Sequence, residues 1–179
     1  YLKYINDKKV SLLLFTFILF ILSVLSKSAA IILPLILFLT DYFFERKFTV
    51  KLILEKVPFL IISVIFALIS VYSQKAPISN TPDFEIMDRI FLVSYSFSFY
   101  LLKFFIPYHF SAIHYFPDSD LPLIYYVSIV TIFIIIALYI YLKSYRKYII
   151  LSLGFFLISI SLVLQIFPLG EAFVAERYT

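Results

Sequence analysis

The stretch from Leu121 to Leu142, LPLIYYVSIVTIFIIIALYIYL, runs for 22 residues without a charged side chain. At about 1.5 Å of rise per residue, a helix of this length covers the roughly 30 Å hydrocarbon core of a bilayer. Because no water is present there, a crossing segment must satisfy its backbone hydrogen bonds internally, which favours a helix. This stretch therefore predicts an α-helical membrane protein.

The composition of the whole chain supports the same class. Of the 179 residues, 63% are hydrophobic and only 15% are charged. Soluble domains are nearer half apolar and a quarter charged, so this chain has too little polar surface to cover a water-facing exterior. Disordered chains, collagen-like repeats and ordinary cytosolic enzymes are excluded. The absence of cysteine further excludes disulfides, zinc–thiolate sites and cysteine nucleophiles.

Five further apolar runs accompany the first stretch. Three are long enough to cross a bilayer: Val10–Ser26, Val57–Gln74 and Tyr148–Gly170, with 17, 18 and 23 uncharged residues. Two are shorter, Ser28–Thr40 and Ile90–Leu102, with 13 uncharged residues each. We therefore expect an all-α, polytopic membrane helix bundle of about five to six membrane helices, forming a single transmembrane domain over residues 1–179.

The basic residues of the connections predict the orientation of these helices, since Lys and Arg concentrate on the cytoplasmic side. The connections with most of them are the N-terminal segment (Lys3, Lys8, Lys9), residues 41–56 (Arg46, Lys47, Lys51, Lys56) and the turn after Leu142 (Lys143, Arg146, Lys147). Residues 74–120 hold more acids than bases and are predicted to form an external loop. With these sides, Ile90–Pro107 should be an interfacial or re-entrant helix. The net charge of +4 then reflects membrane orientation rather than nucleic-acid binding.

Two groups of charged side chains fall on the predicted external side. Lys27 separates two apolar runs; it is either a turn residue that reaches to the interface or a cation that binds an anionic group such as a lipid-linked phosphate. Glu176 and Arg177 form either a structural pair or a phosphate contact, because the planar guanidinium donates two parallel hydrogen bonds.

Other polar residues have simpler interpretations. His114 and Tyr115 lie in the external loop, where aromatic side chains are typical of a headgroup belt and substrate contacts are the alternative. With only His109 nearby, His114 does not predict a metal site. Asp83, Glu85 and Asp88 follow Thr81-Pro82 and indicate the first turn of a helix. Asp41 is interpreted as part of a cytoplasmic stop-and-anchor signal.

A series of short motifs occurs in the order found in one family of membrane enzymes. They are Leu25-Ser26-Lys27, Leu33-Pro34-Leu35, Asp41-Tyr42-Phe43, Leu54-Glu55-Lys56-Val57-Pro58-Phe59, Val93-Ser94-Tyr95, Tyr100-Leu101-Leu102-Lys103, Ile106-Pro107, Tyr115-Phe116-Pro117 and Val174-Ala175-Glu176-Arg177-Tyr178-Thr179. From about Leu12 to Thr179 the chain resembles bacterial relatives of the transmembrane and tetratricopeptide-repeat-containing O-mannosyltransferases. It differs from them in having no tryptophan, no acidic first-loop motif and no C-terminal repeats.

The resemblance implies part of a C-type glycosyltransferase, multi-pass in a bacterial inner membrane. Such an enzyme moves a sugar, here a mannose-like hexose, from a polyprenyl-phosphate carrier to a protein Ser or Thr at the external face. It implies that Lys27 and Arg177 contact the carrier phosphate, that Glu176 orients Arg177, and that His114 and Tyr115 contact substrate.

The catalytic carboxylate is then expected outside this chain segment, so no catalytic residue is assigned and no cofactor is expected here. Expected partners are the bilayer, the lipid-linked sugar donor, the protein acceptor, and further N-terminal spans and C-terminal repeats of a longer chain, but no nucleic acid. A transporter or flippase of lipid-linked sugars and a non-catalytic membrane subunit are alternatives. The sequence leaves the sugar, the acceptor and any metal requirement open.

Overall fold

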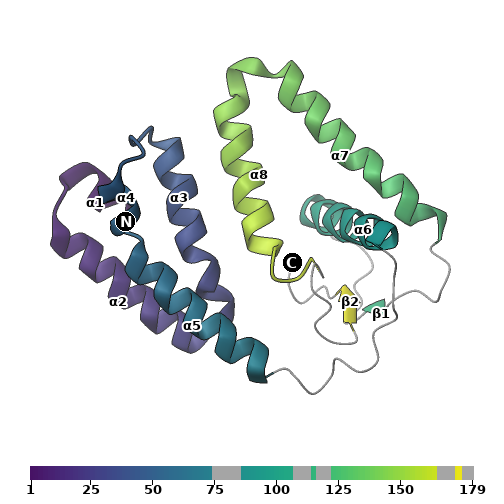
Figure 1. Ribbon diagram of the computed structural model, residues 1–179. Coiled ribbons are helices and arrows are strands. Elements are labelled where there is room, and N and C mark those ends of the chain that lie inside the picture. The colour runs from purple at the N-terminus through teal and green to yellow at the C-terminus, as the bar shows by residue number, and fades with distance from the viewer. Residues whose placement is uncertain (74–85, 107–113, 116–121, 165–171, 175–179) are drawn as a thin grey trace. The chain divides into compact units, whose positions relative to one another are not determined.

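A computed structural model gives the fold and describes residues 1–73, 86–106, 114–115, 122–164 and 172–174. These residues are almost entirely helical, which confirms the all-α class, and two short strands are the exception. The chain divides by its contacts into two compact units, each described here by itself (Figure 1). Unit 1 comprises Tyr1–Ser73 and Leu151–Ile158, and unit 2 comprises Gln74–Ile150 and Ser159–Thr179.

Short connections join the elements from α1 to α5 and those from α7 to α8, and longer ones separate the rest. In chain order they are α1 (Leu2–Asp7), α2 (Val10–Ser26), the 3-10 helix η1 (Ser28–Ile32), α3 (Leu33–Phe43), α4 (Val50–Leu54), α5 (Val57–Ser73), α6 (Ile86–Phe105), β1 (His114–Tyr115), α7 (Leu123–Tyr141), the 3-10 helix η3 (Lys143–Tyr145), α8 (Arg146–Ile160) and β2 (Ala172–Val174).

Unit 1 is built on a helical hairpin. The first helix, α2, ends at Ser26 because Lys27 adopts an extended backbone, with φ −148° and ψ 121°. The chain then turns through η1 into α3, where Pro34 lies in the first turn and its missing N–H costs no helical hydrogen bond. Helix α5 packs against α2, η1 and α3. Helix α2 thus has α1 at its N-terminal end and η1 at its C-terminal end.

A small aromatic and aliphatic core holds this hairpin to α5. Phe20 and Val24 of α2, Leu37 of α3 and Phe59 of α5 are buried together. The Phe59 ring meets Phe17 edge-on, with a centroid distance of 5.1 Å. Such edge-to-face pairs stabilise by about 1 kcal/mol beyond the area they bury.

The last helix adds a close contact to unit 1 through a glycine. A Cβ atom placed on Gly154 of α8 would lie 3.0 Å from Cδ1 and 3.1 Å from Cδ2 of Leu39 in α3. Small residues allow helices to approach closely, which is a common packing device between membrane helices. Gly154 therefore makes room for the Leu39 side chain.

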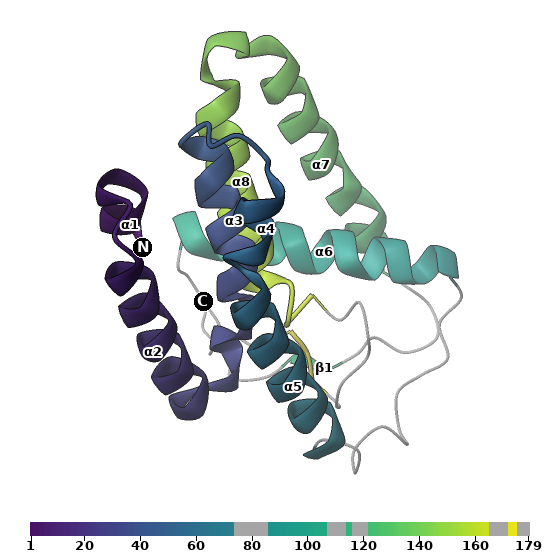
Figure 2. The ribbon, with the colours of Figure 1, turned by 60° about the vertical axis from the view of Figure 1, so that its left-hand side comes forward.

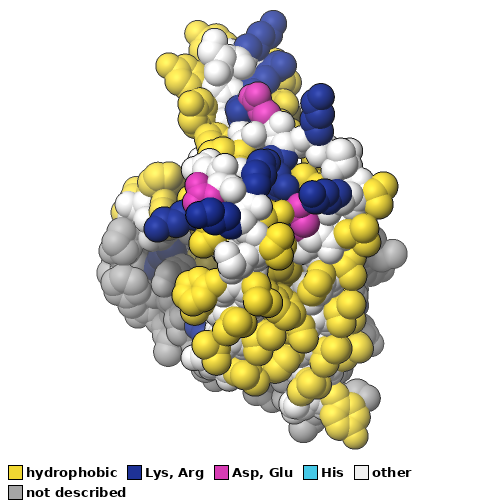
Figure 3. All heavy atoms as spheres, turned by 90° about the vertical axis from the view of Figure 1, so that its left-hand side faces the viewer, with side chains coloured by type: hydrophobic (Ala, Val, Ile, Leu, Met, Phe, Trp, Pro, Cys, Tyr) yellow, Lys and Arg dark blue, Asp and Glu magenta, His cyan; other side chains and the backbone are white. Residues whose placement is uncertain are grey.

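The helices of unit 1 also expose many large apolar side chains on their outer faces. Leu14, Phe15 and Leu22 of α2 and Val64 and Leu68 of α5 are all more than half exposed. Figure 3 shows hydrophobic side chains covering the lower part of the face that it draws. A water-soluble protein rarely exposes so extensive an apolar surface, whereas lipid-facing helices require one.

Two helical runs among the described residues are long and apolar enough to cross a membrane. They are the 24 residues Val50–Ser73, which join α4 and α5, and the 19 residues of α7. Val10–Ser26 and Ser28–Phe43 are apolar but shorter. The predicted run Val10–Ser26 coincides with α2, and the predicted runs Val57–Gln74 and Leu121–Leu142 each differ from their helices by one or two residues at an end.

The remaining runs differ more. The predicted run Ile90–Leu102 lies inside the longer α6, a continuous 20-residue helix. The predicted run Tyr148–Gly170 corresponds to α8, which ends at Ile160, and residues 165–170 lie outside the described part of the chain. An interfacial or re-entrant position of α6 stays a prediction, as do five to six membrane crossings.

Unit 2 is organised by the crossing of α6 and α7, which Figure 2 shows at a large angle to each other. Ser94, Ser96 and Ser98 of α6 are all buried. The Ser98 hydroxyl donates to the backbone carbonyl of Ser128 in α7 at 3.1 Å. Beside this bond the rings of Tyr95 and Tyr125 stack with centroids 4.2 Å apart.

The second feature of unit 2 joins segments that are distant in sequence. Strand β1 pairs antiparallel with β2, with His114 opposite Val174 and Tyr115 opposite Ala172. The register is irregular between His114 and Tyr115, so the ladder is short.

Candidate functional site

A cluster of buried charges lies where α3, α4 and α5 meet in unit 1. Asp41 in the last turn of α3 and Lys56 just before α5 are both fully buried. Their side chains form an ion pair between Lys56 Nζ and Asp41 Oδ2. Arg46, from the connection after α3, donates to Asp41 Oδ1 at 3.0 Å and to Glu55 Oε2 at 3.0 Å. Two acids and two bases thus compensate one another.

Two tyrosines of α1 and its start complete the cluster. The Tyr1 hydroxyl donates to Asp41 Oδ1 at 2.7 Å, and Lys56 Nζ lies 5.2 Å from the centre of the Tyr1 ring. The Arg46 guanidinium lies 5.6 Å from the centre of the Tyr4 ring, within range of a cation–π interaction. Burial and the hydrogen bond to Asp41 raise the pKa of Tyr1 well above its ordinary value, so its hydroxyl remains a donor at neutral pH.

The arrangement of this cluster indicates a structural role. Burial opposes the charge of Arg46, but its hydrogen bonds to Asp41 and Glu55 outweigh burial and raise its pKa above the usual value. Every charge in the cluster has an opposite partner within the cluster. Buried charges are tolerated only when paired in this way. The cluster therefore holds the end of α3 against the start of α5, and none of its charges is left unpaired to bind a ligand.

Sequence reasoning missed this cluster. The charge pattern predicts only that Arg46 and Lys56 lie on the cytoplasmic side, and Asp41 is interpreted as part of a stop-and-anchor signal. The one available signal was the presence of three acids, Asp41, Glu45 and Glu55, among the bases of the same connection. Compensating charges within one short connection can pair on folding, although their spacing alone does not show that they do.

Lys27, by contrast, is an exposed cation at the opposite end of α2. Its side chain is exposed, and it makes no ion pair with any residue that the structure describes. Its extended backbone separates α2 from η1. The prediction of a charged break between two apolar helices is confirmed in position, and what Lys27 binds stays a prediction.

The other predicted site residues belong to unit 2. His114 and Tyr115 form β1, which pairs with Ala172–Val174, so the structure brings the external-loop motif beside the start of the C-terminal signature. The side chains of His114 and Tyr115 lie outside what the structure describes, as do Glu176 and Arg177 altogether. The described chain ends in β2 at Val174, three residues before Arg177.

Metal chemistry finds no support in the part of the chain that the structure describes, since no three His, Asp or Glu side chains there are grouped to hold an ion.

No protein-family model, curated protein or solved structure matches the chain.

Proposed function

We propose that the chain is the membrane region of a glycosyltransferase that moves a mannose-like hexose from a polyprenyl-phosphate carrier to a protein Ser or Thr at the external face. In this proposal the chain is part of a multi-pass bundle of about five to six membrane helices. Two kinds of observation support it: the ordered series of family-like motifs in the sequence, and helices with outward apolar surfaces, two of them long enough to cross a bilayer.

The observation that carries the proposal is the pairing of β1 with β2. Two of the family-like motifs begin at the last residue of these strands: Tyr115-Phe116-Pro117 and Val174-Ala175-Glu176-Arg177-Tyr178-Thr179. They lie far apart in the sequence, but the first residue of each lies in the ladder, Tyr115 opposite Ala172 and Val174 opposite His114. A shared location is expected if both motifs serve one substrate site, and it has no obvious purpose if they are only membrane-flanking residues.

The proposed chemistry needs positive charge near the leaving group. The acceptor hydroxyl oxygen attacks the anomeric carbon of the sugar, the bond from that carbon to the carrier phosphate oxygen breaks, and the phosphate leaves with the electron pair. Cations that contact this phosphate stabilise the developing charge. We assign this role to Lys27 and Arg177, with Glu176 as the residue that orients Arg177, while His114 and Tyr115 contact substrate. The base that accepts the hydroxyl proton is expected elsewhere in the full-length protein.

The test is sugar transfer by the full-length protein carrying Lys27→Ala or Arg177→Ala. We expect each variant to lose transfer, and Lys143→Ala, which removes an exposed lysine from η3, to retain it. Unchanged transfer in both site variants would overturn the role assignment. Transbilayer movement of the lipid-linked sugar without transfer would instead support the transporter or flippase, and dispensability of both residues in every assay would support a non-catalytic subunit.

Sequencing of the coding region on both sides of this chain gives an independent test. The proposal expects an upstream external loop with an Asp or a pair of Asp residues, and downstream helical repeats. An open reading frame without an upstream acidic loop would leave the transfer reaction without its base and would overturn the enzyme assignment.

A further inference from the structure

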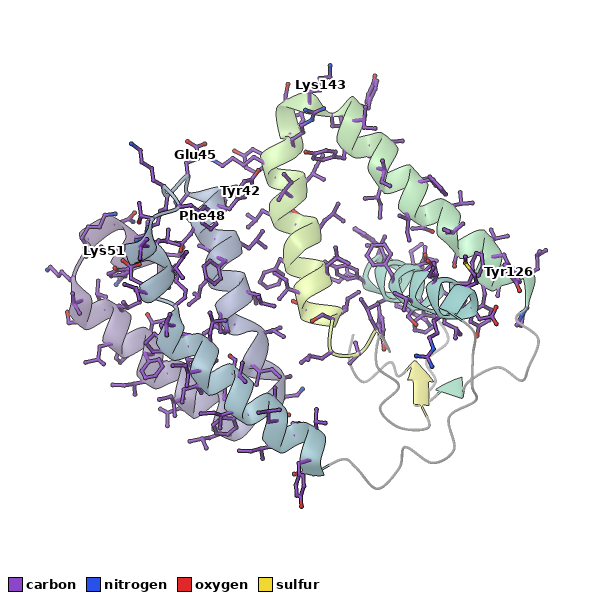
Figure 4. All side chains as sticks on the ribbon, viewed as in Figure 1. Tyr42, Glu45, Phe48, Lys51, Tyr126 and Lys143 are labelled. Atoms are coloured by element: carbon purple, nitrogen blue, oxygen red, sulfur yellow. The ribbon has the colours of Figure 1, made fainter. Side chains whose placement is uncertain are left out.

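The connection between α3 and α4, with the adjoining ends of both helices, carries exposed lysines and aromatic rings, which we call the basic–aromatic surface. It consists of Tyr42, Phe44, Lys47, Phe48 and Lys51. All five side chains are exposed, and Phe48 is 67% exposed. Figure 4 shows Tyr42, Phe48 and Lys51 lying around this connection, together with Glu45.

The net charge of this surface follows from the buried cluster beneath it. Two of the three acids of the connection region, Asp41 and Glu55, are held inward by Arg46 and Lys56. The charges that remain exposed are Lys47 and Lys51, against Glu45 alone. Because the buried cluster is neutral as a whole, it does not offset the positive charge at the surface.

Neighbouring lysines of unit 1 extend this positive end. Lys3, Lys8 and Lys9, against Asp7, are exposed in and after α1. Helix α1 lies at the same end of unit 1 because the Tyr1 hydroxyl donates to Asp41. Counting Lys3, Lys8, Lys9, Lys47 and Lys51 against Asp7 and Glu45 leaves three positive charges in excess at the surface.

The surface continues directly into apolar, outward-facing helix. Val50, Ile53 and Leu54 of α4 are exposed, and they open the 24-residue run that is long and apolar enough to cross a membrane. Aromatic rings and lysines at the end of such a run occupy the depth at which a bilayer presents its headgroups. Lysine stems can lie along apolar surface while their ammonium groups reach the phosphates.

We propose that the basic–aromatic surface binds the anionic phospholipid headgroups of the bilayer, with Lys47 and Lys51 contacting lipid phosphates and Phe48 inserted between the headgroups. A lipid surface is favoured over a protein partner because the positive charge and the exposed rings are continuous with a lipid-facing helix. The inference is independent of the proposed transfer reaction, since it concerns the end of unit 1 opposite Lys27.

The proposal predicts a local enrichment of anionic lipid around Phe48. A lysine near an anionic surface contributes a preference of up to about fivefold, and salt screens it. We therefore expect a several-fold enrichment that depends on both lysines and falls with increasing ionic strength.

The chain provides a clean probe because it contains no tryptophan. In Phe48→Trp, the single indole replaces a ring of the surface and reports which lipids touch it. The protein is reconstituted in vesicles that contain phosphatidylglycerol and phosphatidylcholine, with bromine atoms on the acyl chains of one or the other. Quenching is then compared at equal mole fractions of the brominated lipid.

We expect brominated phosphatidylglycerol to quench the fluorescence of this single indole more strongly than brominated phosphatidylcholine. In the same background, Lys47→Gln with Lys51→Gln should abolish the difference, whereas Lys47→Arg with Lys51→Arg should retain it. Lys143→Gln removes one exposed charge outside this surface and should leave it unchanged, and Glu45→Gln should increase it.

Equal quenching by the two lipids, or a preference that survives in Lys47→Gln with Lys51→Gln, would overturn the proposal. Circular dichroism of each variant confirms that its helices are retained, so that a lost preference reports lipid contact rather than unfolding. Failure of this test would leave the proposed transfer reaction untouched, because sugar transfer is measured on different residues.

Discussion

Lys56 and Asp41 form an ion pair in which the side chains are 1% and 0% exposed. The two residues come from different helical segments, so their pairing ties the end of α3 to the start of α5. Taking such charges out of water costs several kcal/mol per ion, and their mutual attraction must offset that cost. The intact pair therefore contributes little net free energy to folding, whereas removal of one of its two charges would destabilise the protein strongly.

Removal of one member of this pair should destabilise the protein strongly. Lys56→Met leaves the buried carboxylate of Asp41 with less compensating charge, and Asp41→Asn leaves the ammonium group of Lys56 with Glu55 alone at 3.5 Å. We expect each variant to lower the free energy of unfolding by about 3 kcal/mol. Denaturant unfolding in detergent micelles, followed by circular dichroism, measures this loss.

The double variant distinguishes pairing from simple loss of packing. With Asp41→Asn and Lys56→Met together, Arg46 and Glu55 remain as a neutral pair, so the total loss should be about 1–3 kcal/mol smaller than the sum of the single losses. Lys51→Met, at an exposed lysine of α4, should change stability by less than about 0.5 kcal/mol. Strictly additive losses would show that the two charges do not depend on each other.

Alanine substitutions at two serines of α6 should change the stability of the protein in opposite directions. Ser98 donates a hydrogen bond to the carbonyl of Ser128, and Ser98→Ala should cost about 0.6 kcal/mol. Ser96 is fully buried, and its hydroxyl has no hydrogen-bond partner among the described residues. Ser96→Ala removes that unsatisfied group and should stabilise by about 1 kcal/mol. Thermal unfolding of both variants in the same detergent measures the two changes in stability. A loss of stability in Ser96→Ala would show that the Ser96 hydroxyl has a hydrogen-bond partner.

The contact of Gly154 with Leu39 predicts a size limit in α8. Gly154→Ala should be nearly neutral, because the gain in helix propensity of about 1 kcal/mol offsets the small shift that the flexible Leu39 side chain must make. Gly154→Val should cost about 1–3 kcal/mol through overpacking. Leu39→Ala in the same chain should recover part of that loss. If Gly154→Val unfolds like the parent protein, α8 does not pack closely against α3.

The two ends of α2 should lie on opposite sides of the membrane. The chain has no cysteine, so single cysteines can be introduced without background labelling. An impermeant thiol reagent should label Lys27→Cys in intact cells and Lys9→Cys only after the membrane is permeabilised. Labelling of both from the same side would show that α2 does not cross on its own and would contradict the predicted orientation.

The helical segments of this chain could be predicted from its sequence because uncharged runs have sharp limits. Lys9 and Lys27 flank α2, and its bounds were predicted to the residue. At α8 the apolar run continued past Ile160 although the helix ends there, and an uncharged run carries no information about such an end. Likewise, α6 begins before Ile90 because Asp88 and Arg89 are compatible with a helix even though they interrupt an apolar run.

The polar interior was harder to predict. A count of charges treats every lysine and arginine as exposed, yet Lys56 is fully buried and Lys51, five residues earlier, is exposed. Which of two such residues turns inward depends on the position of Asp41, which tertiary folding alone determines. The pairing of His114 with Val174 is of the same kind, since no local pattern joins segments so distant in the sequence.

That pairing also constrains the order of events during biosynthesis. His114 and Val174 are 60 residues apart, and both α7 and α8 lie between them. A ribosome must therefore complete both helices before β1 can find its partner, and closing so long a loop carries an entropic penalty that only the finished fold can offset. The segment that leads into Glu176 and Arg177 then assembles after both helices, so a nascent chain arrested before residue 172 would carry the helices without this ladder.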